Sequence, residues 1–290
     1  MAKLKTNRDR LVRTTVTGEI THPRVGGSVY RISVDGEPIC VPGSGGVTIN
    51  VRVGDPANGW RGDHVEPAVS IKNRESEEAN GGLNVLACIG NAAVVLTGEA
   101  KGATGRVTGK HGGAEHVMVD FDEATMRKML PGDRLRVDAW GQGLQLADHP
   151  EVTCFSLDPD FLDAWGLEGR DGKLRVPVAH CAPAAAMGSG LGRDNAYRGD
   201  YDINLFDEAT VREYGLEDLR LGDLVAIVDA DTTFGRHYRR GSTIIGIIAH
   251  CDSYIAGHGP GVTCLLTARD GKIEPVVDPK ANIADALRLR

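Results

Sequence analysis

The six cysteines of this 290-residue sequence include no C-x-x-C pair. That spacing excludes a zinc ribbon, and the missing secretory leader argues against a disulfide framework. No apolar run approaches the ~20 residues that a membrane helix needs. We therefore expect a cytoplasmic protein without membrane contacts, in which most cysteines are buried thiols.

Basic residues are outnumbered by acidic ones, and aromatic side chains are scarce. The formal net charge is −7 and aromatic residues make up 5% of the sequence. An acidic surface works against attraction to phosphate backbones, so a nucleic-acid partner is not expected. Glycine, by contrast, occurs 38 times. This abundance favours turns and a β-rich architecture.

Period-two alternation of apolar and polar residues predicts strands along much of the chain. These strands are expected within residues 28–53, 83–96, 105–119 and 242–249. Helix-start and helix-stop residues predict a short helix at 158–166, and the tail 281–290 has a modest amphipathic pattern. The sequence thus favours a mainly β fold with a few short helices.

Two near-identical segments indicate an internal duplication. Residues 121–127 read FDEATMR and residues 206–212 read FDEATVR, and a Gly-Asp turn and an alternating strand follow both copies. We therefore expect two related barrel-like or sandwich-like halves. Their predicted limits are 1–150 for the N-terminal domain and 151–290 for the C-terminal domain.

A first polar motif lies at residues 62–67, GDHVEP. In an extended segment the side chains of His64 and Glu66 share one face, whereas Asp63 points to the other side. His64 and Glu66 are therefore candidate metal ligands or an acid/base pair. The same residues would equally suit a charged surface loop.

Glycine-rich segments supply further candidates. His111 lies in GKHGG, a loop that could present it to a ligand. A strand-like segment then leads to His180 and Cys181, after which glycines free the backbone to approach an anion. The candidate ligand-binding residues of that loop are Gly188, Ser189, Gly190, Arg193 and Asn195, with Asp194 as a candidate base. A flexible connection of small residues is the alternative interpretation.

The last motif follows the predicted strand 242–249. Strand periodicity places His250 and Asp252 on one side and Cys251 on the other, in the core. His258 stands alone on a rigid GHGPG turn. A buried structural histidine would explain His250 as well as a site does, but it explains His258 less well.

Three resemblances bear on function. Residues 94–107 resemble the KOW motif of ribosomal and elongation proteins, which implies a strand-turn-strand unit that contacts RNA. The segments GDHVEP, NVLACIGN, GKHGG, GSGLGRDN and GHGPG are similar to a bacterial and archaeal family described as a domain of unknown function, which implies a two-part β-rich fold. His111-Gly-Gly and the entry of the strand after Pro131 resemble acetamidase/formamidase, which implies amide chemistry.

We expect from these patterns a metal-assisted hydrolase that cleaves an amide or other C–N bond of a small polar molecule. A non-catalytic module that binds a small ligand or RNA is the alternative. The expected divalent-metal ligands are His64, Glu66, Asp252 and His258, and His180, Cys181 and Asp194 are the expected catalytic residues. His111 and His250 join the glycine loop in binding substrate. Abundant strand edges also favour a homo-oligomer.

Overall fold

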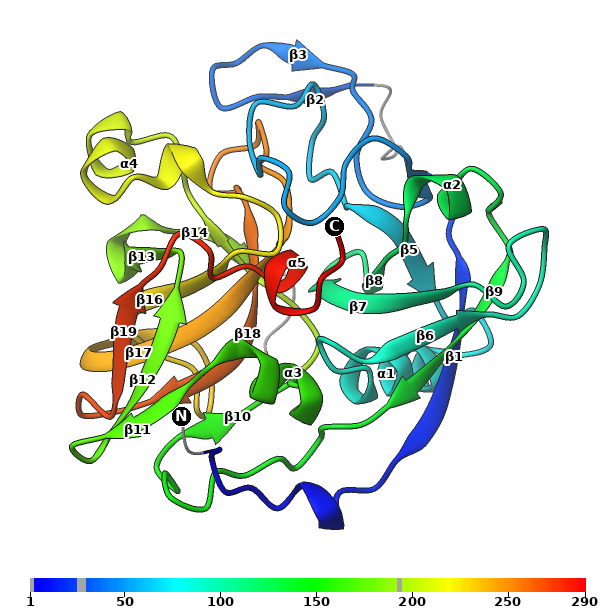
Figure 1. Ribbon diagram of the computed structural model, residues 1–290. Helices are drawn as coiled ribbons and strands as arrows, with labels where there is room; N and C mark the ends of the chain where they lie inside the picture. Colours follow the sequence, from blue (N-terminus) through cyan, green and yellow to red (C-terminus); the bar gives the residue numbers. More distant parts are fainter. Residues whose placement is uncertain (1–2, 25–29, 192–194) are drawn as a thin grey trace.

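The computed structural model describes residues 3–24, 30–191 and 195–290, and it places two large sheets in separate halves of the molecule (Figure 1). The first half, coloured blue to green, lies on the right of the view, and most of the second half lies on the left. The predicted mainly β fold with short helices and two related halves is confirmed.

A closed antiparallel barrel forms the first half. Its neighbour order, β1-β9-β6-β7-β8-β5, returns to β1 because β1 pairs with both β9 and β5, and β4 adds to β5. Closure leaves few unpaired strand edges, and apolar side chains such as Ile71, Val107 and Val137 are fully buried. The strands are β1 (Thr14–Ile20), β4 (Val47–Thr48), β5 (Ala68–Lys72), β6 (Ala92–Val95), β7 (Thr104–His111), β8 (His116–Asp120) and β9 (Arg134–Ala139).

A mixed sheet dominates the second half, in the order β13-β16-β17-β18-β15-β14, with β10 paired to β18. A smaller sheet has the order β11-β12-β19. The strands of the large sheet are β10 (Thr153–Cys154), β13 (His180–Pro183), β14 (Met187–Leu191), β15 (Tyr201–Ile203), β16 (Leu224–Asp231), β17 (His237–His250) and β18 (Gly261–Ala268). Those of the smaller sheet are β11 (Glu168–Arg170), β12 (Lys173–Val178) and β19 (Ile273–Val277).

The two repeated segments fold alike. Each begins a short helix, α2 (Glu123–Met126) or α4 (Glu208–Tyr214). The capping aspartate, Asp122 or Asp207, accepts a hydrogen bond from a backbone N–H of the first turn. A strand follows each copy, β9 in the first half and β16 in the second. The predicted helix near 158–166 is also present, as α3 (Pro159–Trp165).

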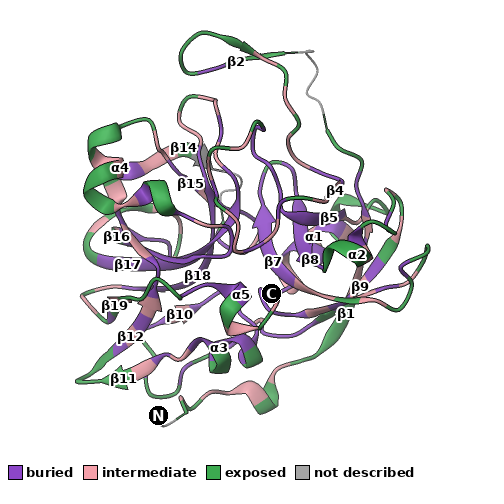
Figure 2. Ribbon diagram, turned by 45° about the horizontal axis from the view of Figure 1, so that its top comes forward, coloured by how far each residue is buried: buried purple, intermediate pink, exposed green. Residues whose placement is uncertain are grey.

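Three local predictions hold only in part. Residues 83–86 belong to a helix, α1 (Glu77–Leu86), because Ser76 caps its first turn and the apolar face packs on the barrel. The region 28–53 holds, in its described part, only two-residue strands, β2 (Arg31–Ile32), β3 (Pro38–Ile39) and β4. In the tail the helix is limited to α5 (Ile283–Ala286). Figure 2 shows the β2–β3 hairpin projecting from the molecule with mostly exposed residues.

Strand packing and hydrogen bonds join the two halves. Strand β7 of the barrel packs on β17 and β18, where Figure 2 shows buried backbone. The Lys110 backbone N–H donates to the Thr263 hydroxyl, which donates back to the Lys110 carbonyl. Residues 54–57 also exchange backbone hydrogen bonds with 219–221. The predicted domain limits at 150 and 151 stay a prediction, and among the described helices none is long and apolar enough to cross a membrane.

Candidate metal centre

Six histidine and aspartate side chains gather where the two halves meet. Among the described residues they form two groups of three, and the potential ligand atoms of each group lie within 4.8 Å of one another. Each group takes one histidine from the first half and an aspartate and a histidine from the second. The inner group is His111, Asp200 and His250, and the outer group is His64, Asp202 and His258.

Strand register in the second half brings the inner residues together. Gly261 on β18 pairs with His250 on one side and with Asp202 of β15 on the other. Asp200 precedes Asp202 by two residues, so both carboxylates face the same side. A side chain on Gly261 would overlap the His250 Nε2 and Asp200 Oδ2 atoms. The glycine therefore leaves the space in which these two groups meet.

The barrel supplies its two histidines from different positions. His111 ends β7, next to the end of β17. His64 lies in the loop before β5, where its backbone N–H donates to the Asp252 carbonyl. His64 has φ of 54°, in the left-handed region that costs energy for a residue other than glycine. The fold thus holds this imidazole in place at the expense of backbone strain.

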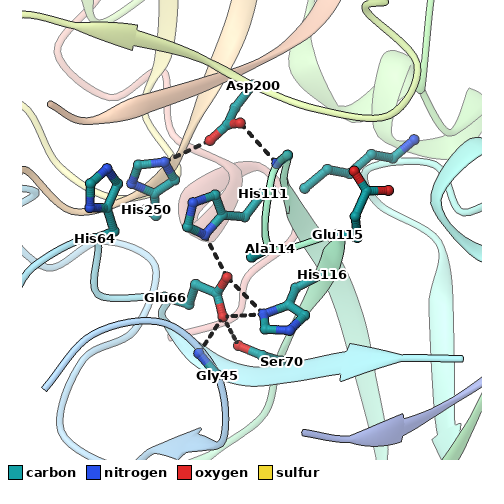
Figure 3. A network of polar contacts seen from close by, with 12 residues as sticks. Gly45, His64, Glu66, Ser70, His111, Ala114, Glu115, His116, Asp200 and His250 are labelled. Atoms are coloured by element: carbon teal, nitrogen blue, oxygen red, sulfur yellow. Dashed lines mark hydrogen bonds and ion pairs between the residues drawn. The ribbon is translucent and has the colours of Figure 1, made fainter. Parts of the chain in front are cut away.

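Three of the four imidazoles are oriented through Nδ1. His111 Nδ1 donates to Glu66 Oε1 at 2.6 Å, and His250 Nδ1 donates to the Cys251 carbonyl at 2.7 Å. His64 Nδ1 lies 3.3 Å from Asp63 Oδ2. A histidine held in this way directs the lone pair of Nε2 inward, as metal-binding histidines do. Figure 3 shows His64, His111 and His250 close together, with Asp200 beside them.

The closest inner pair is His250 and Asp200. His250 Nε2 and Asp200 Oδ2 lie 2.6 Å apart, yet both atoms are buried without a hydrogen-bond partner among the described residues. Burial lowers the pKa of His250, but the contact with Asp200 outweighs it and raises the pKa to about 9. Burial opposes ionisation of Asp200, but His250 lowers its pKa to about 2. Without an ion, the charged imidazole and the carboxylate form a buried ion pair.

The outer group is more open. His64 Nε2 lies 3.0 Å from His258 Nδ1, and Asp202 Oδ2 lies 3.1 Å from His258 Nδ1 and 3.8 Å from His64 Nε2. The side chain of His258 is 34% exposed, whereas the inner histidine His250 is fully buried. Solvent therefore reaches the centre from the His258 side.

Comparisons with known proteins agree on one family. The family model described as "Domain of unknown function (DUF4438), N-terminal" matches residues 30–163, and the corresponding C-terminal model matches residues 164–287. The chain belongs to the DUF4438 family. A solved structure titled "Crystal structure of TM1086" is 44% identical and covers 98% of this chain and 99% of its own, with a TM-score of 0.93. No curated protein matches the sequence.

Two predicted ligands of this DUF4438 chain lie outside both groups. Glu66 is fully buried behind the histidines, where it accepts hydrogen bonds from His111, His116, the Ser70 hydroxyl and the Gly45 N–H. Burial disfavours its charge, but His116 and His111 hold its pKa well below the usual range. Asp252 instead faces the Gly59 N–H, and burial raises its pKa to about 6. Glu66 therefore orients His111 and His116, and Asp252 is not brought to either group.

The predicted catalytic pair His180 and Cys181 lies elsewhere, on β13. His180 Nε2 is 3.9 Å from Asp223, a buried carboxylate that also contacts Arg220. Cys181 packs against the main apolar core, and burial raises the pKa of its thiol, which is the opposite of activation.

The glycine loop approaches the outer group in part. Gly188 packs so closely on the Gly257 carbonyl that a side chain there would overlap it, and Ser189 lies against Gly257 in the same way. Gly190 belongs to β14, next to β15. Asn195 accepts a hydrogen bond from the Tyr197 N–H. The predictions for Arg193 and Asp194 lie outside the described residues.

Sequence reasoning missed Asp200 and Asp202. They form a D-x-D pair in the segment GDYDIN, and period two in an extended segment would have placed both carboxylates on one face. That signal was available, but a short strand of three residues is hard to recognise from alternation alone.

Proposed function

We propose that this protein is a metal-dependent hydrolase that cleaves an amide or other C–N bond of a small polar molecule. The inner group, His111, Asp200 and His250, would hold the divalent ion. Two imidazoles and one carboxylate are ligands that first-row divalent metals accept, and three protein ligands leave positions for water and substrate.

The observation that carries the proposal is the inner pair. A neutral His250 ring carries one N–H, at Nδ1, and donates it to the Cys251 carbonyl. The other nitrogen, Nε2, then directs a lone pair toward the Asp200 carboxylate. Two acceptors buried at 2.6 Å would repel each other, so the pair needs either the extra proton that the raised pKa of His250 supplies or a cation in place of that proton. A divalent ion with bonds of about 2.0–2.2 Å would satisfy both once the two side chains moved apart, because neighbouring ligand atoms of a tetrahedral ion lie about 3.3–3.4 Å from each other.

The chemistry follows from the ion. It would polarise the carbonyl of the scissile bond and lower the pKa of a bound water. The water oxygen forms a new bond to the carbonyl carbon, the C–N bond breaks, and the amine nitrogen takes up a proton from that water. The products are a carboxylic acid and an amine, and water is the sole co-reactant.

Access to the centre supports a small substrate. His250 and Asp200 are almost completely buried, and His111 and His64 expose only 11% and 10% of their side chains. His258 is the most exposed of the six side chains and Ser189 packs against the same turn, so a substrate would approach the inner group from this side. A polymer would have to be threaded to that depth.

The test combines metal content with turnover. Purified protein is stripped with a chelator, reloaded with Zn²⁺, Mn²⁺ or Co²⁺, and assayed for amine or ammonia release from formamides, N-acyl amines and ureido compounds. We expect retained metal and chelator-sensitive hydrolysis. His111→Ala should lose the ion of the inner group and with it the hydrolysis, and the exposed control His237→Ala should change neither. Protein that retains no metal after reloading, or hydrolysis that persists without metal, would overturn the proposal.

A further inference from the structure

We infer that the outer group, His64, Asp202 and His258, binds a second divalent ion, so that the centre is dinuclear and Asp202 is shared by both ions. This inference rests on the proposed function, because it assumes that the inner group binds a metal. It adds a second site and a bridging ligand that the hydrolase proposal does not require.

The spacing of the outer atoms matches an ion. Tetrahedral bonds of about 2.0–2.1 Å separate neighbouring ligand atoms by about 3.3–3.4 Å. The three separations among His64 Nε2, His258 Nδ1 and Asp202 Oδ2 are 3.0, 3.1 and 3.8 Å. They bracket the expected value, so an ion would need only small movements of the side chains.

Protons cannot satisfy these atoms fully. With His64 Nδ1 facing the Asp63 carboxylate, the neutral ring of His64 presents a lone pair at Nε2. The Asp202 carboxylate also only accepts. One proton on His258 Nδ1 would have to serve both acceptors.

The Asp63 carboxylate, which fixes the orientation of His64, is itself held by other groups. Asp63 accepts hydrogen bonds from the Ser253 hydroxyl and the Tyr254 N–H, and Arg31 forms an ion pair with it. Glu66 does the same for His111 in the inner group. Carboxylates that fix the far nitrogen of an imidazole are typical of metal ligands, and here both barrel histidines have one.

Asp202 lies between the two groups. Its Oδ2 atom faces His258 and also accepts from the Gly259 N–H, whereas Oδ1 is 3.9 Å from His250 Nε2 of the inner group. The ring centroids of His64 and His250 are 5.3 Å apart. In two-metal hydrolytic sites the ions lie about 3.5–4 Å apart, and a single carboxylate can span that distance.

The first measurement is a count of ions. Metal-free protein is titrated with Co²⁺ or Zn²⁺, and bound metal per chain is determined by elemental analysis after gel filtration. We expect two ions per chain in the natural protein. One ion per chain overturns the second site while leaving the hydrolase proposal intact, and no bound ion overturns both.

Variants assign the two sites. His258→Ala is expected to retain one ion, and since His258 is partly exposed its loss should leave the fold intact, which circular dichroism checks. His237→Ala is the matched control and should retain two. If His258→Ala still binds two ions, the outer group is not the second site.

Whether Asp202 bridges the two ions can be measured on the natural protein by electron paramagnetic resonance. Loading with Mn²⁺ to two ions per chain should give an electron paramagnetic resonance spectrum with exchange coupling between the ions. Two uncoupled Mn²⁺ signals would overturn the shared carboxylate.

Discussion

The ends of β7 and β17 and the start of β13 all present a histidine, but only the first two take part in the centre. His111 and His250 meet carboxylates from other segments, and each has one ring nitrogen fixed. His180 lies 3.9 Å from Asp223, and that carboxylate is already bound by Arg220 and Asn282. The comparison teaches that convergence of separate segments, rather than a local run of polar residues, makes a site.

The substitution His250→Ala should have the largest effect on stability and metal binding. His250→Ala leaves the buried Asp200 carboxylate without its partner, and breaking a buried pair costs about 3–5 kcal/mol of folding free energy. We also expect loss of the ion of the inner group. Urea unfolding and metal analysis measure both effects. The exposed His237→Ala should match the natural protein, and an equally stable His250→Ala protein that keeps the ion of the inner group would contradict the role given to this pair.

A methyl group at Gly261 should have the next largest effect. Gly261→Ala forces His250 and Asp200 away from the space they share, and overpacking of this kind costs about 1–3 kcal/mol. Metal affinity should fall with stability. The control is Gly82→Ala in α1, where nothing lies near the added atom and helix propensity should give a small gain. Similar thermal unfolding of both variants would show that the Gly261 contact is unimportant.

Replacement of Glu66 should weaken the centre without abolishing it. Gln at this position keeps the size but loses the charge that holds His111 and His116, and loss of such an orienting contact typically costs 10–100-fold in metal affinity. Competition with a chromogenic chelator measures the affinity of Glu66→Gln against the exposed control Glu75→Gln. Complete loss of metal would instead make Glu66 a direct ligand, as the sequence first suggested.

The smallest effects are expected on β13. His180→Ala and Cys181→Ala should leave metal content and hydrolysis unchanged, because neither side chain lies in the two groups and the raised thiol pKa disfavours a nucleophile. Assays of both variants beside the natural protein test this. Abolished hydrolysis with full metal content in Cys181→Ala would restore covalent catalysis and reverse the comparison.

Much of the fold could be predicted from local patterns. The repeated FDEAT segments begin capped helices because Asp122 and Asp207 satisfy free N–H groups of the first turn, which is a purely local effect. Helix α1 was missed because Gly81 and Gly82 lie within it and suggest a turn, although Ser76 and the acids after it form a helix start.

The candidate site could be predicted only in pieces. His64 and His258 stood out because glycines and turns surround them, and they do meet. Their partner Asp202 depends on how β15 pairs with β18, and such pairing joins residues far apart in sequence. Glu66 shares a strand face with His64 only if the segment is extended, but His64 adopts a left-handed conformation and the alternation fails there. Register and backbone strain are tertiary properties that no single sequence reveals.

The packing of β7 on β17 also bears on how the two halves can be separated. Each group draws one imidazole from residues before 112 and its other two ligands from residues after 199. An ion bound to either group would act as a cross-link between distant parts of the chain, much as a disulfide does, and would oppose separation of the halves. A half expressed alone would lack part of both ligand sets. Both candidate ligand sets therefore depend on the two halves together, and a chain with two copies of one half would lack part of each set.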